Sequence, residues 1–195
     1  DVLSVFAGLR PLAAPKADST KTKEISRGHK IIVSLSSLIT MTGGKWTTYR
    51  KMGEDAIDQA IMVADLDERN SSTKFMPIHG HDEEAVDGEK LRFYGSDRHK
   101  ILALIEKDST LGEKLHPKLD FVKAEVIWAV KEEMARTIED VLARRVRALF
   151  LDARASMEMA AVVAELMAPH LGWDKARTAK EIEKYKELAQ GYVLT

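Results

Sequence analysis

The sequence predicts an α+β fold, in which a small strand–turn–helix region precedes a mainly α-helical domain of about five helices. Leu38, Ile39 and Met41 form a strand-like apolar run among threonines, and this run ends at Gly43 and Gly44. Apolar residues then recur at helical spacing over residues 49–61. From about residue 96 the apolar spacing is helical almost to the end of the chain. With 195 residues, the chain is long enough to bury a sizeable core.

Two more strand-like runs come before this turn. The first begins directly after Asp1 and ends near Arg10 and Pro11, where the backbone becomes stiff. The second is the β-branched run of residues 31–33, and His29 is expected in a short loop between strands.

Five helices are expected in the second half of the chain. Several begin with a side chain that can accept a hydrogen bond from the first helical turn. These predicted caps are Ser96 for the first helix, Thr137 with Asp140 for the third, Asp152 for the fourth and Asp174 for the fifth. The second helix is expected to carry apolar residues from Val122 to Met134, and Gly112 and Pro117 break the chain ahead of it.

The composition excludes several classes of protein. Charged residues make up 31% of the chain and the net charge is −1, so a general binder of nucleic acid is not expected. No apolar run is long enough to cross a membrane as a helix. The chain has no cysteine, which excludes disulfides and thiol chemistry. No metal site is predicted, because His79 and His81 lie in a Gly- and acid-rich loop without a helix to fix them.

The turn at Gly43, Gly44 and Lys45 is a candidate anion site. A helix that begins directly after two glycines leaves backbone N–H groups without partners, and this end of a helix carries a partial positive charge. Glycine permits a close approach of backbone to ligand, and Lys45 adds a full charge. The alternative is an ordinary corner between a strand and a helix.

Three sequence blocks occur in order between residues 5 and 50. They are Val5-Phe-Ala-Gly-Leu-Arg-Pro-Leu12, Ile25-Ser-Arg-Gly-His29 and Thr42-Gly-Gly-Lys-Trp-Thr-Thr-Tyr-Arg50. Their order and spacing resemble the FAD-dependent glycerol-3-phosphate dehydrogenases, which are flavoproteins of the D-amino-acid-oxidase-like superfamily. Residues 124–147 resemble the carboxy-terminal helical domain of the same family.

The resemblance implies oxidation of sn-glycerol 3-phosphate to dihydroxyacetone phosphate, with hydride transfer to FAD and electrons passed on to a quinone or other acceptor. The chain opens without Met, and no Gly-x-Gly-x-x-Gly follows a predicted strand. We therefore expect a carboxy-terminal part of a longer enzyme, which alone neither retains FAD nor turns over substrate. Residues 1–66 are expected to end the FAD/substrate domain, 67–95 to form a linker and 96–195 to form the helical domain.

Charge and resemblance together indicate the substrate residues. Residues 1–52 contain nine Lys or Arg against three acids, which suits phosphate or reduced flavin, although a solvated loop is the better interpretation for the lysines of residues 16–23. We expect Arg10 and Arg27 to hold the substrate phosphate through their guanidinium groups. Without the resemblance, an ion pair with a carboxylate would be favoured for both.

Lys45 is expected to act both in catalysis and in substrate binding. The resemblance places the flavin against residues 43–48, where N–H groups can stabilise negative charge on the N1–C2=O2 edge of the reduced ring. The expected cofactor-binding residues are Gly43, Gly44, Lys45, Trp46, Thr47 and Thr48. At least one of the two threonines is expected to cap the helix, while Trp46 and Tyr49 are expected to pack. The catalytic base is unassigned, with His29 a weak candidate.

A second hypothesis concerns the helical domain. It could be an interaction module without a catalytic role, contacting another subunit, a membrane surface or a regulator. A cytoplasmic location is expected, with peripheral membrane contact and homo-oligomers left open.

Overall fold

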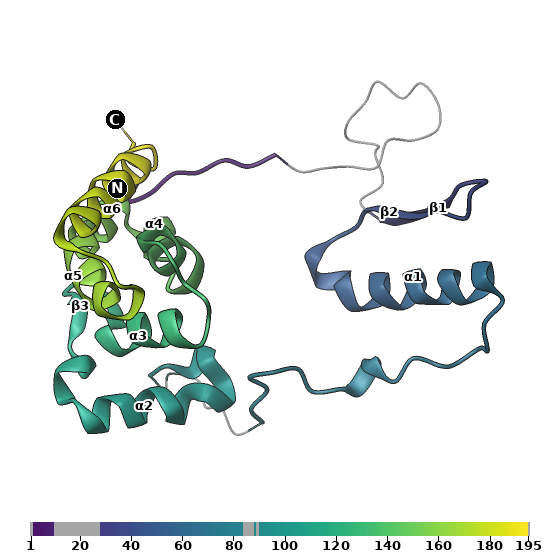
Figure 1. Ribbon diagram of the computed structural model, residues 1–195, viewed down its shortest axis with the longest axis horizontal. Helices are drawn as coiled ribbons and strands as arrows, with labels where there is room; N and C mark the ends of the chain where they lie inside the picture. Colours follow the sequence, from purple (N-terminus) through teal and green to yellow (C-terminus); the bar gives the residue numbers. More distant parts are fainter. Residues whose placement is uncertain (1, 10–27, 84–87, 89, 195) are drawn as a thin grey trace. The chain divides into compact units, whose positions relative to one another are not determined.

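The computed structural model describes residues 2–9, 28–83, 88 and 90–194. The chain divides into two compact units, one formed by residues 8–78 and the other by residues 1–7 together with 79–195 (Figure 1). We call them the amino-terminal unit and the helical unit. The three-part division expected from the sequence stays a prediction.

The amino-terminal unit is an antiparallel hairpin followed by a long helix. Strand β1 (His29–Val33) pairs with β2 (Ile39–Gly43), in a register that places Ile31 opposite Met41. A single 3-10 turn, Trp46–Thr48, leads into α1 (Tyr49–Ala64), and the hairpin lies along this helix in Figure 1. The predicted order of strand, glycine turn and helix is therefore confirmed.

The amino-terminal unit has no buried side chain among its described residues. Its large apolar side chains are half or more exposed at many positions, including Ile57, Leu66 and Phe75. The hairpin and helix therefore present apolar surface rather than enclose it.

The helical unit contains most of the regular structure. Its elements are the 3-10 helix Arg92–Asp97, α2 (Arg98–Lys107), β3 (Lys114–His116), β4 (Leu119–Val122), α3 (Lys123–Lys131), the π-helix Asp140–Arg145, α4 (Ala148–Leu151), α5 (Ala153–Leu171) and α6 (Lys175–Gln190). The predicted fold class, a mostly helical α+β chain, is confirmed. The predicted third helix is instead a π-helix followed by the separate short helix α4.

The core of the helical unit is built around α5. This helix packs against α3, α4 and α6, and α5 and α6 lie side by side in Figure 1. Met159, Val163 and Met167 of α5 are fully buried, and the Ser156 hydroxyl hydrogen-bonds the Tyr185 hydroxyl of α6. Burial of this kind contributes roughly 1.5–3 kcal/mol for each large side chain.

Three predicted helix starts are confirmed by their hydrogen bonds. The Asp152 carboxylate accepts from the Ala155 N–H at 2.9 Å, and that of Asp174 accepts from the Arg177 N–H at 2.7 Å. Thr137 and Asp140 form a reciprocal pair, in which each side chain accepts from the other's backbone N–H. α5 ends, as expected, at Gly172 in the left-handed conformation.

The structure corrects four further local predictions. Ser96 does not cap the first helix, because it lies inside the 3-10 helix and α2 begins after Asp97. The second helix ends at Lys131, and Met134 is exposed with a positive φ. His29 begins β1 instead of lying in a loop.

The fourth correction concerns residues 2–9. The strand-like run that begins after Asp1 forms no strand in its described part. The two strands of the hairpin β3–β4 were not predicted at all, because Pro117 reads as a break and each strand is very short.

No helix in the described part of the chain is long and apolar enough to span a membrane.

Candidate functional site

The turn of Gly43, Gly44 and Lys45 lies between β2 and α1. Gly43 and Gly44 both have positive φ, 76° and 87°, which side chains other than glycine rarely adopt. A Cβ at Gly44 would come within 2.5 Å of the Met52 sulfur and 3.3 Å of the His29 Cβ. Gly44 is therefore required by the corner itself, whether or not a ligand approaches it.

Lys45 extends from this turn into solvent. Its backbone is extended and its side chain is exposed. Within the residues that the structure describes, the Lys45 ammonium has no ion-pair partner. This leaves the charge available for an anion.

The amides beyond Lys45 are only partly available. The Thr48 N–H donates to the Lys45 carbonyl at 3.0 Å and the Tyr49 N–H donates to the Trp46 carbonyl, so both amides are occupied. No hydrogen bond from the N–H groups of Lys45, Trp46 or Thr47 is seen within the described ranges. The available set is therefore narrower than the stretch from Gly44 to Thr48 that the sequence predicts.

Two side-chain roles expected at this turn are wrong. Neither Thr47 nor Thr48 caps a helix with its side chain, and the Thr48 hydroxyl donates instead to the Lys45 carbonyl at 3.0 Å. Trp46 is 87% exposed and stacks on the half-exposed Tyr49 at 5.7 Å between ring centroids. Both rings are thus on the surface of the described chain rather than packed within it.

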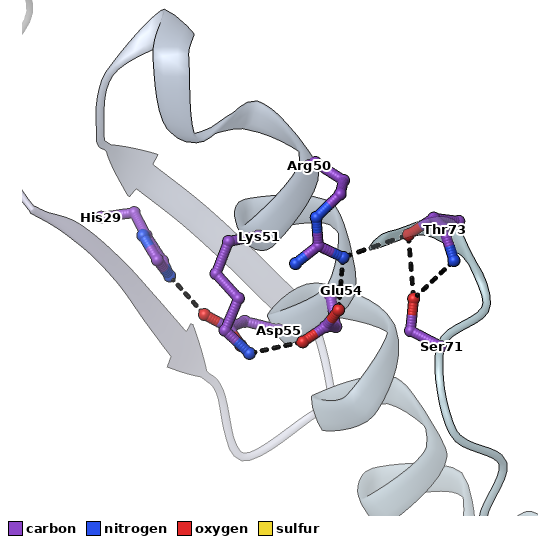
Figure 2. A network of polar contacts seen from close by, with 7 residues as sticks. All are labelled: His29, Arg50, Lys51, Glu54, Asp55, Ser71 and Thr73. Atoms are coloured by element: carbon purple, nitrogen blue, oxygen red, sulfur yellow. Dashed lines mark hydrogen bonds and ion pairs between the residues drawn. The ribbon is translucent and has the colours of Figure 1, made fainter. Parts of the chain in front are cut away.

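The other cations of this region are used internally. Figure 2 shows Arg50 and Lys51 of α1 turned toward the carboxylates of Glu54 and Asp55. The Lys51 ammonium lies 2.6 Å from a Glu54 oxygen and 2.9 Å from an Asp55 oxygen. Arg50 also bonds Glu54 and donates to the Thr73 hydroxyl at 3.1 Å. These two charges are compensated, in contrast to that of Lys45.

The paired charges shift the titration of both acids. Hydrogen bonds from Lys51 and then Arg50 lower the pKa of Glu54 to about 2. Hydrogen bonds from Lys51 and then His29 lower the pKa of Asp55, and the contacts with Asp55 and then Glu54 raise the pKa of Lys51. This network was not predicted from the sequence, although Arg50 and Glu54 at i and i+4 are a recognised helical pairing signal.

His29 contacts the same network. Its Nε2 lies 2.8 Å from an Asp55 oxygen, and both side chains are about a quarter exposed, at 22% and 28%. The imidazole is thus held by a carboxylate on α1, an arrangement that fixes its orientation.

Two groups of residues in the described chain carry side chains of the kinds that bind metals. Glu54, Asp55 and Asp58 have carboxylate oxygens within 4.8 Å of one another, but the first two are neutralised by Lys51, Arg50 and His29. His79 bonds Asp97, and His81 lies 3.5 Å from a Glu83 oxygen. In the described residues, Glu54, Asp55 and both histidines therefore already make polar contacts within the chain.

Arg10 and Arg27, the two predicted phosphate ligands, lie outside the described residues. The structure therefore describes only the Lys45 part of the predicted cradle.

Comparison with known families decides the relationship. Residues 39–178 match the family described as the C-terminal domain of alpha-glycerophosphate oxidase. The chain belongs to this family. The match begins in β2 and ends in α6, so the alpha-glycerophosphate oxidase C-terminal domain includes parts of both units.

Curated relatives agree with the family. The chain is 33% identical to the mitochondrial glycerol-3-phosphate dehydrogenase SDP6 of Arabidopsis thaliana, over 98% of the chain and 35% of that protein. A probable mitochondrial glycerol-3-phosphate dehydrogenase of Caenorhabditis elegans is 36% identical, over 94% of the chain and 28% of its own length. Glycerol-3-phosphate dehydrogenase 2 of Mycobacterium tuberculosis (strain ATCC 25618 / H37Rv) is 32% identical over the whole chain and 36% of its own length. The chain thus spans about a third of the relatives it matches.

The resemblance predicted from the three sequence blocks is confirmed by these matches. The chain is related to glycerol-3-phosphate dehydrogenases along almost its whole length.

Proposed function

We propose that this chain is the carboxy-terminal part of a flavin-dependent glycerol-3-phosphate dehydrogenase and contributes the phosphate-binding side of its active site. The observation that carries the proposal is the exposed, uncompensated charge of Lys45 on a left-handed glycine turn, next to compensated Arg50 and Lys51. The relatives' names supply the substrate class: they are glycerol-3-phosphate dehydrogenases.

Lys45 binds an oxygen of the substrate phosphate in this proposal, together with the guanidinium groups of Arg10 and Arg27. A charged hydrogen bond of this kind contributes about 1.5–3 kcal/mol. Three cations on one dianion fix its orientation as well as its position, because arginine presents two N–H groups in a plane.

The residues of the turn also fit a flavin edge. The N–H groups of Lys45, Trp46 and Thr47 have no partner in the described structure and can donate to an electron-rich carbonyl. When bound, FAD supplies the acceptor for the hydride that leaves C2 of the substrate. The amides at the turn then stabilise negative charge on the N1–C2=O2 side of the ring, which is worth a few kcal/mol when donors are preorganised.

The base that takes the C2 hydroxyl proton is not assigned to this chain. His29 is held by Asp55, and nothing in the described part places a substrate beside it. The chain has no Gly-x-Gly-x-x-Gly fingerprint, so we propose that alone it neither retains FAD nor turns over substrate. Transfer of electrons to a quinone, a cytoplasmic location and peripheral membrane contact belong to the same proposal for the full-length enzyme.

The test uses an enzyme that spans the full length of the relatives. Arg10→Ala and Lys45→Ala should each lower kcat/KM for glycerol 3-phosphate by about tenfold or more, because each removes a charged contact to the phosphate. Lys51→Ala is the matched control, since it removes a neighbouring charge that is already paired, and kcat/KM should stay within about twofold. Unchanged kinetics in both Arg10→Ala and Lys45→Ala would overturn the proposal.

A second function, an interaction module, has one observation in its favour. The helical unit has its own core around α5, so it has the packing needed to fold without the amino-terminal unit. Sedimentation of the 195-residue chain tests this function: self-association supports it, and a monomer without affinity for lipid vesicles argues against it.

A further inference from the structure

A cavity lies between the first two turns of α5 and the carboxy-terminal end of α6. Its volume is about 510 Å³, which is within the range of sites that bind small molecules. Side chains of α5 and α6 line it, together with Val193 and Leu194, which come after α6. All of these residues belong to the helical unit. We call this cavity the α5–α6 pocket.

The packing of α5 on α6 fixes the walls of the pocket. Ala160 of α5 and Ala189 of α6 are fully buried, and the buried hydroxyls of Ser156 and Tyr185 hydrogen-bond each other between the two helices. Each of these four residues lies within two positions of a residue that lines the pocket. The pocket is therefore formed before a ligand arrives, which lowers the entropy cost of binding.

Two cations from different helices line the pocket. Arg154 is on α5 and Lys186 is on α6, and both residues are exposed. Neither side chain makes an ion pair or a hydrogen bond with any other residue that the structure describes. Both charges are therefore available to an anionic ligand.

Glu158 also lines the pocket, but its carboxylate contacts a residue of β3. A Glu158 oxygen lies 2.9 Å from the His116 Nε2. The His116 Nδ1 accepts from the Lys118 N–H at 3.2 Å, so the neutral ring carries its hydrogen on Nε2 and donates it to Glu158. Glu158 keeps its negative charge in this arrangement. The described lining thus has two cations and one anion, and its excess of one positive charge matches a monoanion.

Apolar side chains adjoin the two cations. Met157 and Val193 are partly buried, pack against the main core and line the cavity. Leu194 lines the same cavity and is 55% exposed. A hydrocarbon chain that covers these side chains removes apolar surface from water, which is favourable in proportion to the area covered. The pocket therefore offers a place for a charged head and a place for an apolar tail.

We propose that the α5–α6 pocket binds a free fatty acid, with its carboxylate between Arg154 and Lys186 and its acyl chain on Met157, Val193 and Leu194. A carboxylate carries the single negative charge that the lining lacks, and a guanidinium group binds it through two parallel N–H groups. The acyl chain accounts for the apolar part of the lining, which an inorganic anion would leave in water. This site does not depend on the proposed function of the Lys45 turn.

Titration of the 195-residue chain with decanoate tests the site. Amide chemical shifts in two-dimensional NMR report where the probe binds, which is needed because the amino-terminal unit also exposes apolar side chains. Decanoate should shift the amides of residues 154–158 and 186–194 until they saturate, with a Kd below about 1 mM. Octanoate should bind about threefold or more weakly, because its shorter chain covers less apolar surface. Absence of saturable shifts in these two segments would overturn the proposal.

Two further probes separate the head from the tail. Decyltrimethylammonium has the same chain length with the opposite charge, and inorganic phosphate has negative charge without a chain. Each should bind at these amides about tenfold or more weakly than decanoate. Equal affinity of decyltrimethylammonium would show an apolar contact only, and equal affinity of phosphate would show an adventitious ion only. Either result would overturn the proposal, as would binding to anionic phospholipid vesicles without binding of decanoate.

Variants assign the contacts to residues. Arg154→Ala and Lys186→Ala should each raise the Kd for decanoate about fivefold or more, because each removes a charged contact to the carboxylate. Lys184→Ala is the matched control, since Lys184 is an exposed lysine outside the described lining and about 200° around α6 from Lys186. Its Kd should stay within about twofold of the parent value.

Leu194→Asn tests the tail at an exposed position and should raise the Kd about threefold. Far-UV circular dichroism checks that each variant keeps its helical content. A Kd equal to that of the parent chain in both Arg154→Ala and Lys186→Ala would overturn the head site, and an equal Kd in Leu194→Asn would overturn the placement of the tail.

Discussion

The two units of this chain place similar side chains in opposite environments. Met167 of the helical unit is fully buried, whereas Met62 of α1 is 74% exposed. Leu149 is fully buried, whereas Leu66 is 61% exposed. The helical unit has an enclosed core, while the described amino-terminal unit has no buried residue, although it carries the Lys45 turn.

This difference shows how the two units divide their roles. A region whose apolar side chains enclose a core has its shape fixed by its own sequence. Clustered exposed apolar side chains are typical of a surface that other protein covers. The candidate chemistry therefore lies in the unit with the weaker internal packing.

The largest expected effect on stability comes from removing one methionine side chain in each unit. Met167→Ala should lower the free energy of unfolding of the helical unit by about 2–5 kcal/mol, because it leaves a hole in a packed core. Met62→Ala removes the same side chain from an exposed position and should change the free energy of unfolding by less than about 0.5 kcal/mol. Urea unfolding of the 195-residue chain, followed by far-UV circular dichroism, measures both. Equal losses in the two variants would contradict the comparison.

Removing a helix cap should lower stability by a smaller amount, again in the helical unit only. Asp152→Ala removes the bond to the Ala155 N–H and should cost about 1 kcal/mol. Thr48→Ala at the start of α1 should cost less than about 0.5 kcal/mol, since Thr48 makes no side-chain cap. Amide exchange in the first turn of α5 and of α1 measures the two losses of stability separately. A loss at Thr48 as large as that at Asp152 would show that α1 is capped in a way absent from this structure.

The smallest effect is the response to pH, which should differ in sign between the units. The pKa of Glu54 is lowered from 4.5 to about 2, so its network contributes stability above about pH 4.5 that is lost as pH falls through its folded pKa. Burial raises the pKa of Glu125, so its contribution is present below about pH 4.5 and is lost as pH rises through its folded pKa.

Two variants measure this difference. The stability gap between the parent chain and Glu54→Gln should narrow as the pH falls below about 4.5. Above about pH 4.5, the parent should instead lose stability relative to Glu125→Gln. Amide exchange of α1 and of α3 as a function of pH measures the two stability differences between parent and variant. If both differences changed in the same direction with pH, the opposite pKa shifts of Glu54 and Glu125 would be contradicted.

Local signals predicted much of the fold from sequence. Asp152 and Asp174 were identified as caps because capping depends on residues only three positions apart. The glycine turn before α1 was identified because positive φ selects glycine. The short hairpin β3–β4 was missed because three or four residues carry too little periodicity, and Pro117 resembles a simple break.

Local sequence patterns predicted less of the candidate site than of the fold. The resemblance identified Lys45, and its exposed charge in the structure agrees with a binding role that remains to be tested. The pairing of His29 with Asp55 and the binding of Val5 to Tyr192 join residues 26 and 187 positions apart, and no local pattern reports such contacts. Arg10 and Arg27 remain predictions from the sequence alone.

Inhibition of the full-length enzyme by inorganic phosphate tests the central claim most directly, because the anion has no reacting carbon and reports binding to the cationic turn alone. Lys45→Ala should raise the inhibition constant by about tenfold or more, and Lys51→Ala should leave it within about twofold. Equal inhibition constants in Lys45→Ala and the parent enzyme would contradict the assignment of the turn as the phosphate site.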